Sequence, residues 1–285
     1  MNKQIEIGKI NSLIVERESK YGLYLRAENF NEVLLPNAYV VEKKMPIGAV
    51  IDVFIYTDFK DRLVASTQYP YAMLGEFGYF KVVEIKQYGS FVDWGLPKDL
   101  FVPLSQQRGQ FEMGKKYILR VCQDKETGRL YGTNKIGKWL SFKPKDLKRN
   151  QKVSILVISK TPLGYKAVVE NLYEGMLFNN EIFQKLSVGD KKIAYIKNIR
   201  GDGKLDLSLQ PIGKKSLINS YEKKILDVLH KRGGSMKIGS KSDASTIKEL
   251  FSMSKKSFKM AFNSLLNKKK IIQDDLGVVR TNKKQ

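Results

Sequence analysis

The feature that most constrains this chain is a segment of about 60 residues that occurs three times in succession. The copies occupy residues 8–66, 75–133 and 153–210, and they share an order of glycine steps and apolar segments, which is weaker in the third copy. The last segment of the third copy, residues 203–209, alternates strictly between apolar and polar residues, as a half-buried strand does. A period this long holds one self-contained core of five short strands, whereas a solenoid turn is shorter. The sequence therefore predicts three small β-barrels in tandem.

The second copy carries the clearest pattern, in residues 80–105. Tyr88 and Phe91 flank Gly89, and in a regular strand two residues three apart would point to opposite faces. Gly89 permits a bulge or bend that brings both rings to one side. Exposed rings beside lysines are what stacking on unpaired bases requires. Ordinary core aromatics explain one copy equally well, but the recurrence of the pattern favours binding. The additional residues of this surface are Phe101, Lys81 and Lys86.

Composition narrows the class of partner. The 51 Lys and Arg against 29 Asp and Glu give a formal net charge of +22, which favours a polyanion. Charge alone leaves ribosome, free RNA, DNA and an anionic membrane open. No apolar run reaches the roughly 20 residues that span a bilayer, and the N-terminus lacks a signal-peptide core. The single cysteine, Cys122, excludes an internal disulfide and a cysteine-clustered zinc site. We expect a cytoplasmic protein without a membrane partner.

The chain is predicted to contain four modules and a linker. Residues 1–70, 71–135 and 151–213 form the three barrels, and residues 136–150 form a basic linker. Residues 214–285 show two longer helical patterns around a short one, followed by two strands at 271–279, which is the order of a winged helix. The fold class is therefore mainly β with a C-terminal α+β unit, built from tandem five-stranded OB-folds and a winged helix.

Charge is distributed unevenly between these modules. Residues 214–285 carry 18 Lys and Arg against 6 Asp and Glu, whereas residues 1–70 carry 9 of each. The C-terminal module should therefore supply the salt-dependent, sequence-independent share of nucleic-acid affinity. The first barrel is neutral, so any binding there has to depend on rings and Arg62.

The succession of an aromatic-glycine-x-aromatic step, an apolar strand and a Gly-Arg/Lys-Leu segment resembles the RNA-binding motif named after bacterial ribosomal protein S-one. The resemblance implies an OB-fold that holds RNA with two aromatics, a His, an Asp and an Arg. On this chain the aromatics match Tyr88 and Phe91 in the second copy and Tyr21 and Tyr24 in the first. The basic position matches Arg62, Arg129 and Lys204.

Several positions depart from that motif. The His position holds Pro36, Pro103 and Phe178 in the three copies. Asp58 matches the acidic position of the first copy, whereas Asp124 is one residue further from its basic partner. In the third copy the aromatic pair is replaced by Leu163 and Lys166, so this copy is expected to contribute charge, through Lys166 and Lys204, or to act as a scaffold.

Three S-one-like units with proline at the His position, followed by a winged helix, resemble the conserved virulence factor B family of low-GC bacteria. The resemblance extends to Gly-Gly-Ser-Met at residues 233–236 and Ser-Lys-Lys-Ser-Phe-Lys-Met-Ala at residues 254–261. It implies an RNA-binding regulatory protein, without known catalysis, that affects the expression of other genes, including virulence functions in bacteria.

The sequence disfavours an enzyme. His230 lies near the end of a predicted helix, where a cap or dipole contact is the expected role. Cys122 has no histidine near it in sequence, and neither a phosphate-binding loop nor a metal-ligand spacing is found. We expect no cofactor and no metal.

These observations give one hypothesis and one alternative. In the first, single-stranded RNA lies across the aromatic faces of the first and second barrels, with phosphates held by basic residues, and the ribosome is a further candidate partner. In the alternative, the winged helix is a transcription regulator that reads duplex DNA with Lys255, Lys256 and Lys259 in the major groove. The candidate RNA-binding residues are Tyr21, Tyr24, Arg62, Lys81, Lys86, Tyr88, Phe91, Phe101, Arg129, Lys166, Lys204, Lys255, Lys256 and Lys259.

Overall fold

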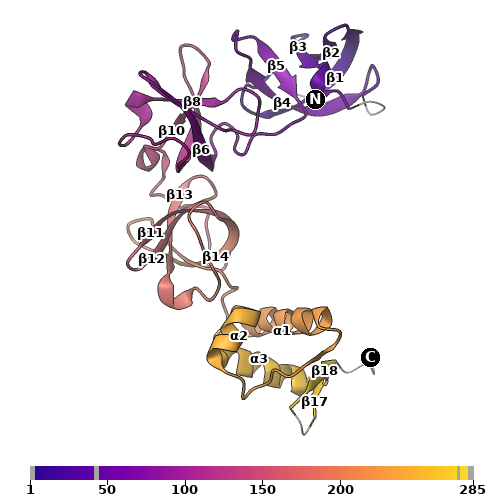
Figure 1. Cartoon of the computed structure of the whole chain (residues 1–285), viewed down its shortest axis with the longest axis vertical. Helices are drawn as coiled ribbons and strands as arrows, with labels where there is room; N and C mark the ends of the chain where they lie inside the picture. The colour runs from indigo at the N-terminus through magenta and orange to yellow at the C-terminus, as the bar shows by residue number, and fades with distance from the viewer. Residues whose placement is uncertain (1–3, 42–44, 275–276, 282–285) are drawn as a thin grey trace. The chain divides into compact units, whose positions relative to one another are not determined.

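The fold was obtained as a computed structural model, which describes residues 4–41, 45–274 and 277–281. The elements follow one another as three modules of strands and a final module rich in helix (Figure 1). Contacts divide the chain into two compact units, Met1–Leu140 and Ser141–Gln285. The first unit holds two strand modules, and the second holds one strand module and the helices. The predicted class, mainly β with a C-terminal α+β unit, is confirmed.

The first module is a closed five-stranded barrel in the order β1-β2-β3-β5-β4. Its strands are β1 (Ile10–Ser19), β2 (Gly22–Arg26), β3 (Glu32–Pro36), β4 (Val50–Thr57) and β5 (Leu63–Ser66). Alternate residues of β1 and β2 are buried, among them Leu13, Val15 and Leu25, as a strand with one wet face requires. A parallel bridge between Leu34 of β3 and Val64 of β5 closes the barrel.

The second module has the same strands, but its hydrogen-bonded sheet stays open, in the order β10-β9-β6-β7-β8. Its strands are β6 (Phe77–Lys86), β7 (Gly89–Val92), β8 (Leu100–Pro103), β9 (Lys116–Gln123) and β10 (Leu130–Thr133). No ladder joins β8 to β10 within the described residues. Side chains fill this seam instead, because a Cβ on Gly132 of β10 would lie 3.0 Å from Val102 Cγ2 and 3.3 Å from Leu100 Cδ2 of β8.

The third module closes like the first, in the order β11-β12-β13-β15-β14. Its strands are β11 (Lys152–Thr161), β12 (Gly164–Val169), β13 (Tyr173–Phe178), β14 (Lys191–Ile199) and β15 (Leu205–Ser208). Leu205 and Leu207 of β15 are fully buried, which confirms the half-buried strand expected from the alternation in that segment.

The last module has α1 (Lys214–Lys231), β16 (Ser235–Met236), α2 (Ala244–Phe251), α3 (Lys255–Asn267), β17 (Ile271–Gln273) and β18 (Val279–Thr281). The three strands form one small sheet in the order β16-β18-β17. Gly234 N–H donates to Leu229 O at 2.8 Å, just after the end of α1. Ser254 caps α3, since its side chain accepts from Ser257 N–H at 3.1 Å.

The glycine of the repeated step has one structural role in all three barrels. A Cβ would lie only 2.0 Å from Leu35 O at Gly22, 2.5 Å from Val102 O at Gly89 and 1.9 Å from Leu177 O at Gly164. A real Cβ does not approach a backbone oxygen so closely, so only glycine lets the second and third strands meet here. The repeat is therefore imposed by strand packing, whatever the residues around the glycine bind.

The first two barrels share a hydrophobic core. Phe54 and Tyr56 of β4 belong to the same buried cluster as Phe80 and Val102 of the second module. Trp94 lies in the middle of it: it is 3% exposed, its ring meets Phe54 edge-on at 5.7 Å, and its Nε1–H donates to Ala72 O at 2.8 Å. Residues 1–140 thus form one packed body rather than two barrels on a string.

Candidate nucleic-acid interface

Three aromatic rings meet on the outer face of the second module. Phe91 of β7 and Phe101 of β8 are cross-strand partners, with ring centroids 5.1 Å apart. Tyr88 lies 6.4 Å from Phe91 and 5.7 Å from Phe101. Tyr88 is 60% exposed and the two phenylalanines are half-buried. We call Tyr88, Phe91 and Phe101 the aromatic face.

The expected cause of this arrangement is wrong in one respect. Gly89 does not form a bulge: β7 pairs in unbroken register from residues 89 to 92, and the irregularity lies in β6, between Val82 and Glu84. Tyr88 is in the turn before β7 and need not alternate with Phe91. Gly89 acts differently, because a Cβ there would lie 2.6 Å from Phe101 Cε2. Because glycine has no Cβ, the Phe101 ring can lie over position 89, next to Tyr88.

The aromatic face lines a groove of about 980 Å³ that also includes residues of the first barrel. The seam between β8 and β10 contributes Leu100, Leu130 and Tyr131, and the β4–β5 turn of the first barrel contributes Thr57, Phe59 and Asp61. Sequence reasoning missed Phe59, which is 78% exposed. It belongs to no repeated landmark, and an aromatic in a polar turn gives no sign of which surface it faces.

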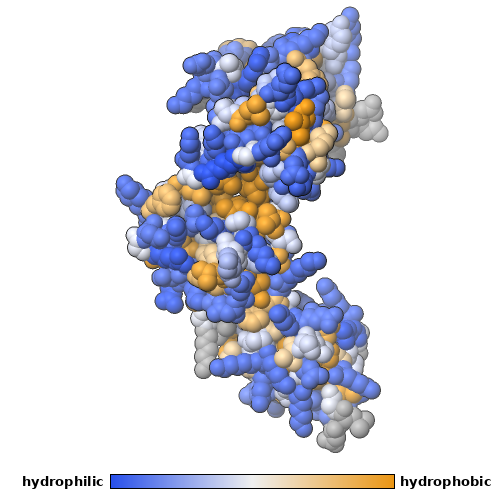
Figure 2. Space-filling view, turned by 60° about the vertical axis from the view of Figure 1, so that its left-hand side comes forward, coloured by the Kyte–Doolittle hydropathy of each residue, from blue (hydrophilic) through white to orange (hydrophobic). Residues whose placement is uncertain are grey.

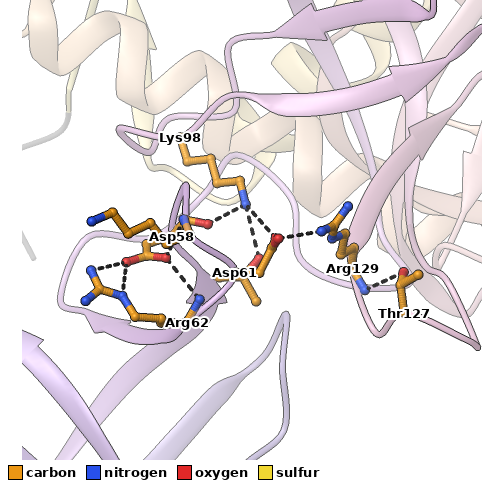
Figure 3. Close-up of polar contacts among 8 residues, drawn as sticks. Asp58, Asp61, Arg62, Lys98, Thr127 and Arg129 are labelled. Atoms are coloured by element: carbon orange, nitrogen blue, oxygen red, sulfur yellow. Dashed lines mark hydrogen bonds and ion pairs between the residues drawn. The ribbon is translucent and has the colours of Figure 1, made fainter.

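Ion pairs hold the β4–β5 turn against the second module (Figure 3). Arg129 pairs with Asp61 across the two modules. Lys98 donates to Asp58 O at 2.7 Å and lies 3.9 Å from Asp61. Arg62 bonds the Asp58 carboxylate at 2.7 and 2.9 Å, and hydrogen bonds from Arg62 hold the pKa of Asp58 below its usual value although burial opposes this. Both basic residues predicted here, Arg62 and Arg129, are thus in ion pairs with aspartates.

Asp124, at the matching position of the second module, has another partner. Its carboxylate accepts from the Thr127 N–H and hydroxyl at 2.8 Å each and from Glu126 N–H at 3.1 Å. These bonds, led by the one from the Thr127 backbone, lower the pKa of Asp124. The extra residue in this turn explains why Arg129 reaches Asp61 and not Asp124.

The two lysines expected beside the aromatic face lie apart from each other. Lys86 pairs with Glu84 at 2.5 Å, on the strand next to Phe91. Lys81 lies on the other side of the β6 irregularity, opposite Lys116 of β9, and it does not line the groove. Lys86, opposite Gly89, does not line the groove either, so it lies nearer to the aromatic face than Lys81 but outside the groove.

The first barrel has no comparable cluster of rings within its described residues. Tyr21 is 61% exposed, with Lys20 Nζ 4.9 Å from its ring centre. Tyr24 is half-buried, and the Arg17 guanidinium lies 3.6 Å from its ring centre. Leu34 occupies the cross-strand position that Phe101 has in the second module. Arg17 already covers the Tyr24 ring that was expected to stack on a base.

The third barrel brings Lys166 and Lys204 together. Their Nζ atoms lie 3.6 and 3.9 Å from Glu174 Oε1, in a pocket of about 370 Å³. Leu163, which is 68% exposed, lies in the turn of the third barrel that corresponds to the turn of Tyr88 in the second module. This pocket corresponds in position to the aromatic groove of the second module. Among its described residues it has two lysines near one carboxylate and no cluster of aromatic rings.

Lys255, Lys256 and Lys259 are all exposed on α3, in its first two turns. None of them forms an ion pair with another residue that the structure describes. Phe258, Phe262 and Leu265 of the same helix are fully buried. The helix thus presents free positive charge on the face opposite its core. More widely, hydrophilic residues cover most of the face seen in Figure 2, with separate apolar patches between them.

Other chemistry has little support among the described residues. Burial raises the pKa of the Cys122 thiol to about 11, so it stays protonated at neutral pH. No group of His, Cys, Asp and Glu there has the arrangement of a metal site. None of the described helices is long and apolar enough to cross a membrane.

Comparison with known proteins agrees with this architecture. Residues 7–68 match the model of the S1 domain, and residues 223–279 match that of the CvfB-like winged helix domain. Conserved virulence factor B of Staphylococcus epidermidis is 26% identical over 98% of this chain and 95% of its own length. The chain is thus similar over nearly its whole length to conserved virulence factor B. The two matched domains are of nucleic-acid-binding types.

Proteins of other bacteria are also similar to this chain. The protein YitL of Bacillus subtilis is 25% identical over 94% of this chain and 91% of its own length. A crystal structure described as a multidomain protein with nucleic acid binding domains, from Streptococcus pneumoniae, is 24% identical. It covers 97% of this chain, and this chain covers 98% of it, with a TM-score of 0.41.

Proposed function

We propose that this protein, like the virulence factor B proteins it resembles in sequence, is a non-catalytic regulator of gene expression, and that it binds single-stranded RNA. Unpaired bases stack on Tyr88, Phe91 and Phe101, and exposed lysines of α3 hold phosphates. The observation that carries the proposal is the meeting of these three rings, one of them 60% exposed, in a groove of about 980 Å³. Bases in a duplex are already stacked and paired, so such a face favours a single strand.

The other predicted residues are expected to contribute to RNA affinity to different extents. Lys86, opposite Gly89, contacts a phosphate outside the groove, and Lys81 contacts one farther along the RNA. Tyr21 and Tyr24 form a lesser contact, because Arg17 lies over the Tyr24 ring. Lys166 and Lys204 add charge from the third barrel. Arg62 and Arg129 are already in ion pairs with Asp58 and Asp61, so we expect them to contribute little to the affinity for RNA.

The proposal is tested by the affinity of the full-length chain for an unstructured, fluorescein-labelled RNA of mixed sequence. Stacking contributes roughly 1–3 kcal/mol per base, so Tyr88→Ala or Phe91→Ala should weaken binding at least about fivefold. The loss should persist at high salt, because stacking releases no counterions. Tyr69→Ala is the matched control, since Tyr69 is a 47% exposed tyrosine outside the groove.

A duplex DNA competitor distinguishes the alternative function. Lys255, Lys256 and Lys259 are suited to phosphates of either nucleic acid, while few neighbours on α3 can read base edges. We expect single-stranded RNA to displace the labelled RNA far better than duplex DNA of random sequence. Preference for the duplex, together with no loss in the Tyr88→Ala and Phe91→Ala variants, would establish the DNA-binding regulator instead.

A further inference from the structure

Phe59 is a large apolar side chain left in water. It is 78% exposed, the highest value for a large hydrophobic residue in the part of the chain that the structure describes. It lies in the β4–β5 turn of the first barrel, yet it lines the same groove as the aromatic face of the second module. An exposed phenylalanine that lines one groove with three other aromatic rings marks a binding position more than a packing one.

The turn that carries Phe59 is held in one conformation. Asp61 N–H donates to Asp58 O at 3.0 Å, and the Asp58 side chain accepts from Lys60 N–H at 2.8 Å and from Arg62 N–H at 3.0 Å. Asp61 has a positive φ of 59°, which Asp tolerates. These bonds fix the backbone on both sides of Phe59, so binding need not order this turn and only the ring torsions remain to be fixed.

The second module holds this turn from outside. Lys98 donates to Thr57 Oγ1 at 3.2 Å and to Asp58 O at 2.7 Å, and Arg129 pairs with Asp61 (Figure 3). Beneath them, Trp94 and Phe54 join the two cores. Contacts between the modules thus position the turn that carries Phe59 relative to Tyr88, Phe91 and Phe101.

The charge of the groove indicates which part of a nucleotide enters it. Its lining includes the carboxylates of Asp61, Glu84, Asp99, Asp124 and Glu126, while its cations, Lys98 and Arg129, already bond to the first barrel. Burial raises the pKa of Asp99, and the negative charges of Asp93 and Glu84 raise it further. A phosphate is repelled here, and an uncharged base is not.

We propose that Phe59 is a further binding residue and that the RNA site is a slot shared by the two modules. A base enters between Phe59 of the first barrel and the aromatic face of the second, and its ribose and phosphates stay outside the acidic groove. This proposal rests on the RNA-binding function proposed above. It gives the first barrel its main role through its β4–β5 turn, with Tyr21 and Tyr24 as a lesser contact.

The test measures RNA affinity of full-length Phe59→Ala, Phe59→Trp and Phe30→Ala with the same labelled RNA. Phe59→Ala should weaken binding at least about fivefold, and Phe59→Trp should retain it, because any aromatic ring can stack. Phe30 is the matched control: it is 76% exposed on the first barrel and does not line the groove. Thermal melting should be unchanged by Phe59→Ala, since so exposed a ring supports little packing.

A double-mutant cycle shows whether the two modules hold the same base. If Phe59 and Tyr88 share a nucleotide, the second substitution costs much less once the first has been made, so the two losses do not multiply. If Tyr88→Ala weakens binding but Phe59→Ala behaves like Phe30→Ala, the shared slot is wrong and the RNA-binding function stands. If Tyr88→Ala and Phe91→Ala leave affinity unchanged, the function itself is wrong.

Discussion

Trp94 should be the residue whose loss most weakens the body formed by the first two barrels. It is 3% exposed, packs edge-on against Phe54 at 5.7 Å and donates to Ala72 O at 2.8 Å. Replacing a buried aromatic by alanine costs about 3–5 kcal/mol. Trp94→Phe keeps most of the packing but leaves the Ala72 carbonyl without this donor, at a cost of about 1–3 kcal/mol.

Urea denaturation followed by far-ultraviolet circular dichroism measures these costs on the full-length chain. Because the first two barrels share a core, we expect them to unfold in one transition, which Trp94→Ala moves to lower urea. Trp139→Ala is the control: Trp139 is 38% exposed, with the Arg120 guanidinium 5.0 Å from its ring, a contact that contributes about 0.5–1 kcal/mol. Equal, small losses for the two tryptophans would refute the shared core.

Two further predictions concern the winged helix. Replacing Lys255, Lys256 and Lys259 by alanine should reduce the slope of log affinity against log salt by up to about 2, at about 0.7 per phosphate contact; an unchanged slope between about 50 and about 200 mM salt would contradict it. Burial opposes ionisation of Glu222, but hydrogen bonds from Lys268 and Ser264 lower its pKa. Glu222 therefore stabilises the fold above its unfolded pKa of about 4.3, and that stability is lost as the pH falls through the lowered folded pKa. Glu222→Gln should destabilise near pH 7 and have little effect in acid, as thermal melting against pH will show.

The modules could be predicted because their signals are local. Gly22, Gly89 and Gly164 recur where two strands approach, and the apolar alternation of β15 persists although the third copy lacks its aromatic pair. The helix caps at Ser254 and Gly234 are local as well. Each of these patterns reports on neighbours within a few residues or on the adjacent strand, which is what periodicity can detect.

The contacts between the first two modules could not be predicted in the same way. Arg129 was assigned to RNA phosphates from the repeat, whereas in the structure it pairs with Asp61, 68 positions earlier in the chain. Phe59 gave no signal for the same reason, since its role depends on where the β4–β5 turn meets another module. The place of Tyr88 in a turn also went unrecognised, because turn and strand differ here by one residue.

Photocrosslinking tests the central claim, that unpaired bases stack on the aromatic face, most directly. An RNA with 5-iodouridine in place of uridine is irradiated in complex with the full-length chain, and the crosslinked residues are identified by mass spectrometry. Crosslinks at Tyr88, Phe91 or Phe101, lost when unlabelled RNA competes, are the predicted result. Crosslinks confined to residues 214–285, with none in residues 75–133, would contradict the account.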